Sequence, residues 1–459
     1  MFCTSCGVRI APPKETIAAP PPVKKSGSFL KFFLLAGSVL IFLFLFGMGS
    51  CVYLVYRAKQ KIESANGTAK SGSGVTPESS PDYSLTEAAH WKSIAAPTGA
   101  TTLLVPLKKG LVITGATSQV DKGDYETIVT FLDASEQGIW LDYTYMGPPA
   151  KAPGRADPPP NVTLRDSVTK RNVLAADLAN AHEIYLYYKG GDPSVYPGTT
   201  SMQVSREVFN ELKTSGETAF TYKVWRQQTP QGAVKDLLGH LMNGGGKVSM
   251  QDLHTGMVTI HCTLRRAIAD DVAMPVIVND KPVDLPAIHT ICQSNQDDLH
   301  LYILDDAQNP LRLASSSRIG QMHGQTVRIA FPEETTENPV EQDLKKTRRA
   351  LLYGIYFDFG SSLIRPQSEP VLQQIAKAMA DNPDWKLTIE GHTDNIGDAA
   401  SNLALSQRRS AAVVQALTSR YHISPDRFSS AGFGSSHPVD RNDTLAGRAR
   451  NRRVELALE

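Results

Sequence analysis

The longest apolar stretch of the chain covers residues 29–56 and contains a single charged side chain, Lys31, near its start. At ~1.5 Å per residue, a helix of this length exceeds the ~30 Å hydrocarbon core of a bilayer. The pattern predicts one transmembrane helix between an N-terminal segment, 1–28, and a flexible linker, 57–84, rich in Ser, Gly and Thr. A cleaved signal peptide, or lipidation at Cys51, is the alternative interpretation.

The middle of the chain, from residue 85 to 335, consists mostly of short aliphatic or aromatic runs separated by Gly, Pro and Asp. Examples are ETIVTFLDAS, AFTYKVW and TVRIAF. Runs of this kind predict β-strands. One helix is expected at QGAVKDLLGHLMNGGG, because the glycine run is a typical helix end.

Two pairs of short motifs in this region match each other at nearly the same spacing. DLANAH at Asp177 matches DLPAIH at Asp284, and GET at Gly216 matches GQT at Gly324. The matches favour two similar β-rich domains, 85–228 and 246–335, that meet near Gly244. Chance matches between short segments are the open alternative.

The last part of the chain, residues 347–459, alternates long periodic helices with short strands. YGIYFDF, WKLTIEG and NRRVELALE predict strands, and SEPVLQQIAKAMADNP predicts a helix that stops at its Asn-Pro pair. A second helix is expected over residues 399–420, with Asp398 at its N-terminus. The order predicts an α+β sandwich of βαβαβ type, with two helices on one face of the sheet.

Composition limits the classes of partner. The 459 residues include 47 Lys and Arg against 46 Asp and Glu, so no global field draws the chain to nucleic acid. Hydrophobic residues make up 41% of the chain, which suits about two to four globular units. We therefore expect a folded protein that does not bind nucleic acid.

The five cysteines fall in three places. Cys3 and Cys6 form a CxxCG knuckle that resembles the first half of a short zinc ribbon, whereas a closed structural zinc site needs four ligands. Either two chains each donate a pair of thiolates, or the knuckle is a relic; no other cofactor is expected. Cys262 and Cys292 can pair if their part of the chain lies outside the cytoplasm, a question that stays open here.

Several motifs near the C-terminus occur in a family-specific order: FDFGSS, IEGHTDNIGDAASNLALSQRRSAAVV, GFGSSHP and GRARNRRVEL. Together they resemble the OmpA-like peptidoglycan-binding domain, which outer-membrane anchors, peptidoglycan-associated lipoproteins and flagellar stator subunits share. The resemblance covers about residues 347–459. It implies noncovalent binding of the peptide stem of peptidoglycan, typically at diaminopimelate.

The chemistry of such a ligand explains the residues expected at the site. The free end of the stem residue is a zwitterion, so a binder needs a carboxylate for the ammonium and a guanidinium for the carboxylate. In the motif that resembles this family, Asp394 and Arg409 supply this pair, and Thr393 and Asn402 are expected to belong to the same site. A loop folding back over the helix start would set Asp394 opposite Arg409; a purely structural ion pair is the alternative.

These observations predict a bacterial inner-membrane protein with a cytoplasmic N-terminus and periplasmic C-terminal domains. It would tether the β-rich region, whose envelope partner no pattern identifies, to the cell wall. An ion-driven stator subunit is one alternative, but it requires an ionisable residue within the membrane, and residues 29–56 contain no Asp or Glu. A cell-wall-modifying enzyme is another. We expect no enzyme, because the sequence lacks the HExxH, GxSxG and Walker motifs and the SxxK at Ser167 lacks its companions.

Overall fold

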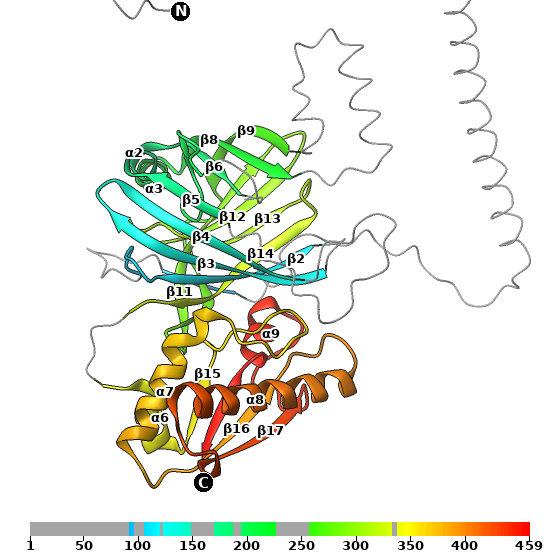
Figure 1. Ribbon diagram of the computed structural model, residues 1–459. Helices are drawn as coiled ribbons and strands as arrows, with labels where there is room; N and C mark the ends of the chain where they lie inside the picture. Colours follow the sequence, from blue (N-terminus) through cyan, green and yellow to red (C-terminus); the bar gives the residue numbers. More distant parts are fainter. Residues whose placement is uncertain are drawn as a thin grey trace, which may run out of the picture. The chain divides into compact units, whose positions relative to one another are not determined.

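The described part of the chain contains a β-rich region followed by an α+β domain (Figure 1). Within that part, no helix has both the length and the apolar character needed to cross a membrane. The predicted span, the cysteine knuckle, the linker and the predicted helix at 231–246 all lie outside the described residues. The structure, a computed structural model, describes residues 91–95, 105–119, 123–147, 169–186, 194–225, 257–332 and 337–459.

The predicted runs of the β-rich region do form strands, and ETIVTFLDAS, AFTYKVW and TVRIAF fall in β3, β8 and β14. Two helices, α2 (Ala175–Asn180) and α3 (Arg206–Thr214), were not expected. The strands are β1 (Lys92–Ile94), β2 (Val112–Gln119), β3 (Gly123–Ser135), β4 (Gly138–Met146), β5 (Thr169–Leu174), β6 (Glu183–Tyr185), β7 (Thr199–Thr200), β8 (Glu217–Trp225), β9 (Met257–Arg266), β10 (Asp271–Val278), β11 (Lys281–Gln293), β12 (Asp298–Leu304), β13 (Arg312–Ser317) and β14 (Met322–Ala330).

These strands belong to one hydrogen-bonded sheet in the order β5-β4-β3-β2-β14-β13-β12-β11-β9-β8-β6-β7. Strand β10 pairs with β1, antiparallel to β11 and parallel to β14. Because β11, β12, β13 and β14 also pair in sequence, β10 to β14 form a closed circuit. Strands from the two expected domains, 85–228 and 246–335, are neighbours in this sheet, since β2 pairs with β14.

One of the two motif pairs that suggested a duplication does not have matching structures, whereas GET and GQT both lie at or in strands, β8 and β14. DLANAH lies largely in α2 and the turn after it, whereas DLPAIH lies within strand β11. A helix and a strand are not copies of one element, so this pair of matches is accidental. The expected boundary near Gly244 lies outside the described residues.

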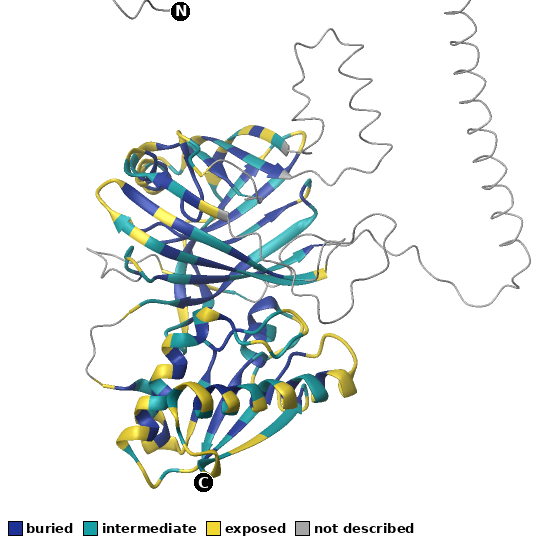
Figure 2. Cartoon of the chain, in the orientation of Figure 1, coloured by how far each residue is buried: buried dark blue, intermediate teal, exposed yellow. Residues whose placement is uncertain are grey.

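Alternation of apolar and polar side chains explains why the strands form. In β4, Ile139 and Leu141 are buried while Trp140 between them is exposed. Their buried faces join the core with Phe131 of β3, and Figure 2 shows such buried positions recurring along the strands. A disulfide between Cys262 of β9 and Cys292 of β11, with Cα atoms 5.9 Å apart, settles the pairing that the sequence left open.

The C-terminal domain has a four-stranded sheet in the order β15-β18-β16-β17, in which only β16 and β17 pair in parallel. The helices expected at 368–383 and 399–420 are confirmed at 369–381 and 399–421, and the strands expected at 385–391 and 451–459 are confirmed at 387–392 and 454–458. Its elements are α6 (Pro339–Thr347), β15 (Arg349–Leu352), α7 (Glu369–Asp381), β16 (Leu387–His392), α8 (Ala399–Tyr421), β17 (Phe428–Gly434), α9 (Leu445–Asn451) and β18 (Val454–Leu458).

One predicted strand, YGIYFDF, is wrong, because the first strand of the domain is β15, just before it. The backbone N–H of Tyr353 donates to Asp280 Oδ1 at 2.8 Å, and that of Tyr356 donates to Ser368 Oγ at 2.8 Å. These side chains satisfy backbone groups that a neighbouring strand would otherwise bind. The segment keeps a single bridge, between Phe357 and Ile364.

Helix α8 lies across β16 and β17 (Figure 1) because two strand glycines allow its backbone to come close. A Cβ at Gly391 would lie 2.3 Å from Ser406 O, and one at Gly432 would lie 2.3 Å from Gln407 N. Asp398 caps the helix, since its side chain accepts a hydrogen bond from Ser401 N at 2.9 Å. The start of α8 is thereby fixed beside the end of β16.

Candidate functional site

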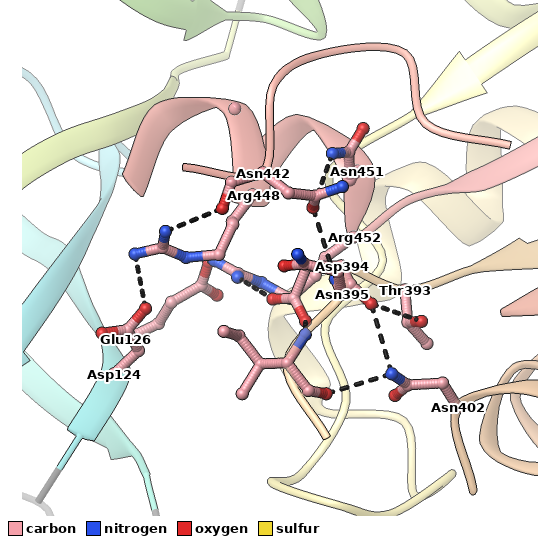
Figure 3. Close-up of polar contacts among 12 residues, drawn as sticks. Asp124, Glu126, Thr393, Asp394, Asn395, Asn402, Asn442, Arg448, Asn451 and Arg452 are labelled. Atoms are coloured by element: carbon pink, nitrogen blue, oxygen red, sulfur yellow. Dashed lines mark hydrogen bonds and ion pairs between the residues drawn. The ribbon is translucent and has the colours of Figure 1, made fainter. Parts of the chain in front are cut away.

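The loop between β16 and α8 carries Asp394, and two predicted site residues hold this loop in place. Thr393 Oγ1 donates to the backbone oxygen of Asp394 at 2.9 Å. Asn402 of α8 donates from Nδ2 to the same oxygen at 3.3 Å and to Ile396 O at 3.0 Å. Figure 3 shows Thr393 and Asn402 on the backbone side of Asp394. Both residues therefore position the loop.

The Asp394 carboxylate is largely buried, with 8% of the residue exposed. Its Oδ1 accepts the backbone N–H of Ile396 at 3.0 Å. Its Oδ2 accepts Arg452 Nη1 at 2.5 Å, so the ion-pair partner of Asp394 is Arg452. Arg452 directly follows α9 and was not among the predicted site residues.

Arg409, in the third turn of α8, makes a different set of contacts. Its Nε donates to Ser361 O at 3.0 Å, Nη2 reaches Asp358 O at 3.5 Å, and the guanidinium lies 4.9 Å from the Phe357 ring centroid. Within the described residues it forms no ion pair with a carboxylate. Burial, reinforced by the positive charge of Arg452, lowers the pKa of Arg409 to about 10. The site thus contains a guanidinium whose charge is not neutralised by direct pairing.

A carboxylate from the β-rich region completes the site. Glu126 of β3 accepts hydrogen bonds from Arg452 Nη2 and, at 2.9 and 3.2 Å, from Arg328 Nη2 of β14. Burial opposes ionisation of Glu126, but the two arginines outweigh it and lower the pKa of this carboxyl to about 2. Asp394, Arg452, Glu126 and Arg328 therefore form a row of alternating charges across the two parts of the chain.

A cavity of about 60 Å³ lies beneath this row, lined by Glu126, Arg409, Arg452 and His392 among others. Burial and the nearby Arg453 lower the pKa of His392 to about 4, so this side chain is neutral at physiological pH. Its ring stacks on Phe433, with centroids 5.3 Å apart. The charged groups around the cavity are therefore mainly guanidinium groups, which favours an anionic ligand.

Asparagines on the far side of the loop connect it to α9. Asn395 N donates to Asn442 Oδ1 at 3.3 Å, and Asn451 Nδ2 donates to the same oxygen at 2.9 Å (Figure 3). Arg448 of α9 donates to Asn442 O at 3.0 Å and forms an ion pair with Asp124 at 2.5 Å. The loop, α9 and β3 are thus linked by polar contacts.

Two groups of His and acidic side chains in the described residues have ligand atoms within 4.8 Å of one another. They are His182 with Glu207 and Glu211, and His392 with Glu390 and Glu455. In the second group the carboxylates already bind Arg349 or Arg453, whose charges oppose a metal ion. The first group lies at the surface around α3. The predicted zinc ligands Cys3 and Cys6 lie outside the described residues.

Sequence reasoning selected Asp394 and Arg409 as site residues, but it did not select Arg452 or Glu126, which the structure places near them. Arg452 lies in the motif GRARNRRVEL, so its presence was visible, although nothing distinguished it from the neighbouring arginines. Glu126 is 326 positions away from Arg452, and no local pattern marks it. Only the three-dimensional arrangement brings the four side chains together.

Comparison with known proteins identifies the family of the C-terminal domain, which carries Asp394, Arg409 and Arg452. The OmpA family model matches residues 356–452. Outer membrane porin F of Pseudomonas fluorescens is 43% identical over 105 residues, which cover 23% of this chain and 32% of that protein. The peptidoglycan-binding protein ArfA of Mycobacterium tuberculosis is 38% identical over 99 residues, 22% of this chain and 30% of that protein. The chain thus spans about a third of the length of these curated relatives.

A solved structure is similar over the same share of the chain. The peptidoglycan-associated lipoprotein from Burkholderia pseudomallei is 34% identical and covers 23% of this chain and 88% of that chain, with a TM-score of 0.22.

Proposed function

We propose that this chain, whose residues 356–452 form an OmpA family domain, binds the peptide stem of peptidoglycan noncovalently through Asp394 and Arg409. The observation that carries the proposal is Arg409, a partly buried guanidinium that forms no ion pair in the described structure and lies in the same site as the Asp394 carboxylate. A relative that matches this domain is named a peptidoglycan-binding protein, which supports the same ligand.

The zwitterionic end of a peptide stem that contains diaminopimelate fits these two charges. Its carboxylate would accept charge-assisted hydrogen bonds from Arg409, and its ammonium would bind Asp394. Thr393 and Asn402 would contribute by holding the Asp394 loop, since their side chains donate hydrogen bonds to its backbone. A rigidly held loop reduces the entropy lost on binding.

The role of the whole chain concerns the apolar segment and the β-rich region as well as the C-terminal domain. We propose that residues 29–56 anchor the protein in the bacterial inner membrane, with the N-terminus in the cytoplasm, and that the C-terminal domain holds the β-rich region at the cell wall. The disulfide between Cys262 and Cys292 supports a periplasmic location, because such bonds persist in oxidising compartments. The β-rich region would then present its surface to an envelope partner.

This role is that of a binding protein without catalytic activity. A stator subunit would need an ionisable residue in the span, and the sequence of that span has no acidic residue. A cell-wall-modifying enzyme is tested directly, since incubation of the purified chain with cell wall should release no soluble fragments. Release of fragments would show that the chain is an enzyme and would contradict this role.

Binding to purified cell wall tests the site. Asp394→Ala and Arg409→Ala should each weaken the free energy of binding, measured by co-sedimentation, by ~2–5 kcal/mol, because each leaves a ligand charge without its partner. Arg408→Ala is the matched control, since Arg408 is the exposed neighbour of Arg409 on the same helix and should bind as the unaltered chain does. Undiminished binding by both site variants, with circular dichroism unchanged, would refute the assignment.

A fusion tests the orientation. A reporter that is active only in the periplasm, placed after Glu459, should be active in cells. Activity of a cytoplasm-dependent reporter at the same position would overturn the orientation and the cell-wall role together.

A further inference from the structure

We propose that the β-rich region closes the stem-binding site by docking onto it, with the carboxylate of Glu126 in the place of the ligand carboxylate. This inference rests on the proposed function and adds a competitor for the same site within the chain. Its basis is the contact between Glu126 of β3 and Arg452, the residue that also neutralises Asp394 (Figure 3). A stem can bind only when the two parts separate.

Glu126 has the chemistry of a competing ligand. Its carboxylate is bound by the guanidinium groups of Arg452 and Arg328, and it lines the same cavity as Arg409. A stem carboxylate bound by Arg409 would occupy the cavity that Glu126 also lines and would be drawn to the same cluster of guanidinium groups. Since two carboxylates at one position repel each other, occupation by Glu126 excludes the stem.

Docking also engages the acidic side of the site. Arg452 Nη1 is 2.5 Å from Asp394 Oδ2, where the ligand ammonium would bind. While Glu126 accepts a hydrogen bond from Arg452 Nη2, the carboxylates of Glu126 and Asp394 together hold the Arg452 guanidinium against Asp394. Withdrawal of Glu126 removes one of them and allows Arg452 to turn towards a stem carboxylate, which leaves Asp394 for the ammonium.

The dimensions of the closed site agree with this interpretation. The cavity next to Arg409 and Arg452 measures about 60 Å³, which is room for a few water molecules. The zwitterionic end of a peptide stem is considerably larger. Its entry therefore requires a movement of Glu126 and β3 rather than a side-chain adjustment alone.

The docking surface extends beyond Glu126 and is formed by polar and apolar contacts. Asp124 binds Arg448 at 2.5 Å, and Asp280 Oδ1 accepts Tyr353 N at 2.8 Å. Such mixed surfaces between domains commonly permit relative motion. The apolar contacts are one cluster of Ala116, Val327, Leu445 and Ala449, and another of Ile128, Met146 and Tyr356.

The thermodynamic consequence is a reduced apparent affinity. When only a fraction of molecules is open, the dissociation constant increases in inverse proportion to that fraction. A change that weakens docking without altering the stem contacts should therefore strengthen binding. Couplings of this kind typically change affinity on the order of 5- to 150-fold.

The test uses the full-length chain purified in detergent and sedimentation with purified cell-wall sacculi. Glu126→Gln keeps the shape of the side chain but removes its charge, so it should bind sacculi on the order of 5- to 150-fold more tightly than the unaltered chain. Equal or weaker binding by this variant, while the unaltered chain binds, would overturn the competitor proposal. Absence of binding by every variant would instead overturn the proposed function and this inference with it.

A charge reversal away from the stem contacts provides a second, independent test. Asp124→Arg places a cation against Arg448 and should also increase binding. Combining it with Arg448→Asp restores an ion pair of reversed sense, so the double variant should return to the affinity of the unaltered chain. If Asp124→Arg does not increase binding, or the double variant stays as tight as the single one, docking does not control the site. Circular dichroism of each variant verifies its fold.

Discussion

Replacing Arg409 with Met should stabilise the folded chain while abolishing stem binding. The reason is that the fold holds this guanidinium in a partly buried position without a paired carboxylate, and burial lowers the pKa of Arg409 to about 10. A base whose pKa is lower in the folded state is charged more easily in the unfolded state. The charge therefore opposes folding at every pH below about 10, and its removal is favourable at neutral pH.

The magnitude follows from the contacts of Arg409. A fall in pKa from 12.5 to about 10 corresponds to about 3 kcal/mol at neutral pH. Against this, Met loses the hydrogen bond to Ser361 O, about 1 kcal/mol, and the cation–π contact with Phe357, about 0.5–1 kcal/mol. Its flexible apolar side chain keeps most of the packing. The net expectation is a gain of about 1–2 kcal/mol in the free energy of unfolding.

Urea unfolding at pH 7, followed by circular dichroism, measures this gain, and sacculus sedimentation measures the loss of binding. Arg408→Met is the control: Arg408 is exposed, so neither quantity should change. The expected combination, higher stability with no binding, is typical of a residue kept for function. A lower free energy of unfolding for Arg409→Met, or retained binding, would show that Arg409 is a structural residue and refute the reasoning.

Three further changes have defined outcomes. Asn402→Ala removes two hydrogen bonds to the Asp394 loop and should weaken sacculus binding about 30-fold, at about 1 kcal/mol per bond; unchanged binding would contradict its positioning role. Gly391→Ala places a Cβ 2.3 Å from Ser406 O and should lower the free energy of unfolding by about 1–3 kcal/mol in urea titrations. Replacing Cys262 and Cys292 by Ser opens a loop of sequence separation 30 and should cost about 3–4 kcal/mol in the same assay; a loss below about 1 kcal/mol would contradict the bond.

Local patterns were sufficient for most elements of the C-terminal domain. The apolar stripe of Leu372, Ile375 and Met379 correctly predicted α7, since all three side chains are buried. The strand at YGIYFDF has an equally regular alternation but fails. Its backbone groups bind side chains such as Asp280, which lies in another part of the chain and leaves no trace in the local sequence.

The site was predictable only as far as a motif contains it. Asp394 and Arg409 belong to one continuous stretch, and in the structure both lie near Arg452, although they do not form a direct pair. Glu126 enters because β3, β2 and β14 are neighbours in a sheet whose order no local pattern determines. The match between DLANAH and DLPAIH is accidental for a related reason, because a few matching letters do not determine whether a segment becomes a helix or a strand.

The pairing of β2 with β14 also has a mechanical consequence. Val112, where β2 begins, lies opposite Ala330, where β14 ends, and Lys108 just before β2 donates a hydrogen bond to Pro332 just after β14. If the chain is the tether proposed above, tension between membrane and cell wall would enter and leave this strand pair at the same end. The interstrand bonds would then carry the load one after another and open like a zipper instead of resisting together in shear. Under such a load the β-rich region would lengthen as β2 separates from β14.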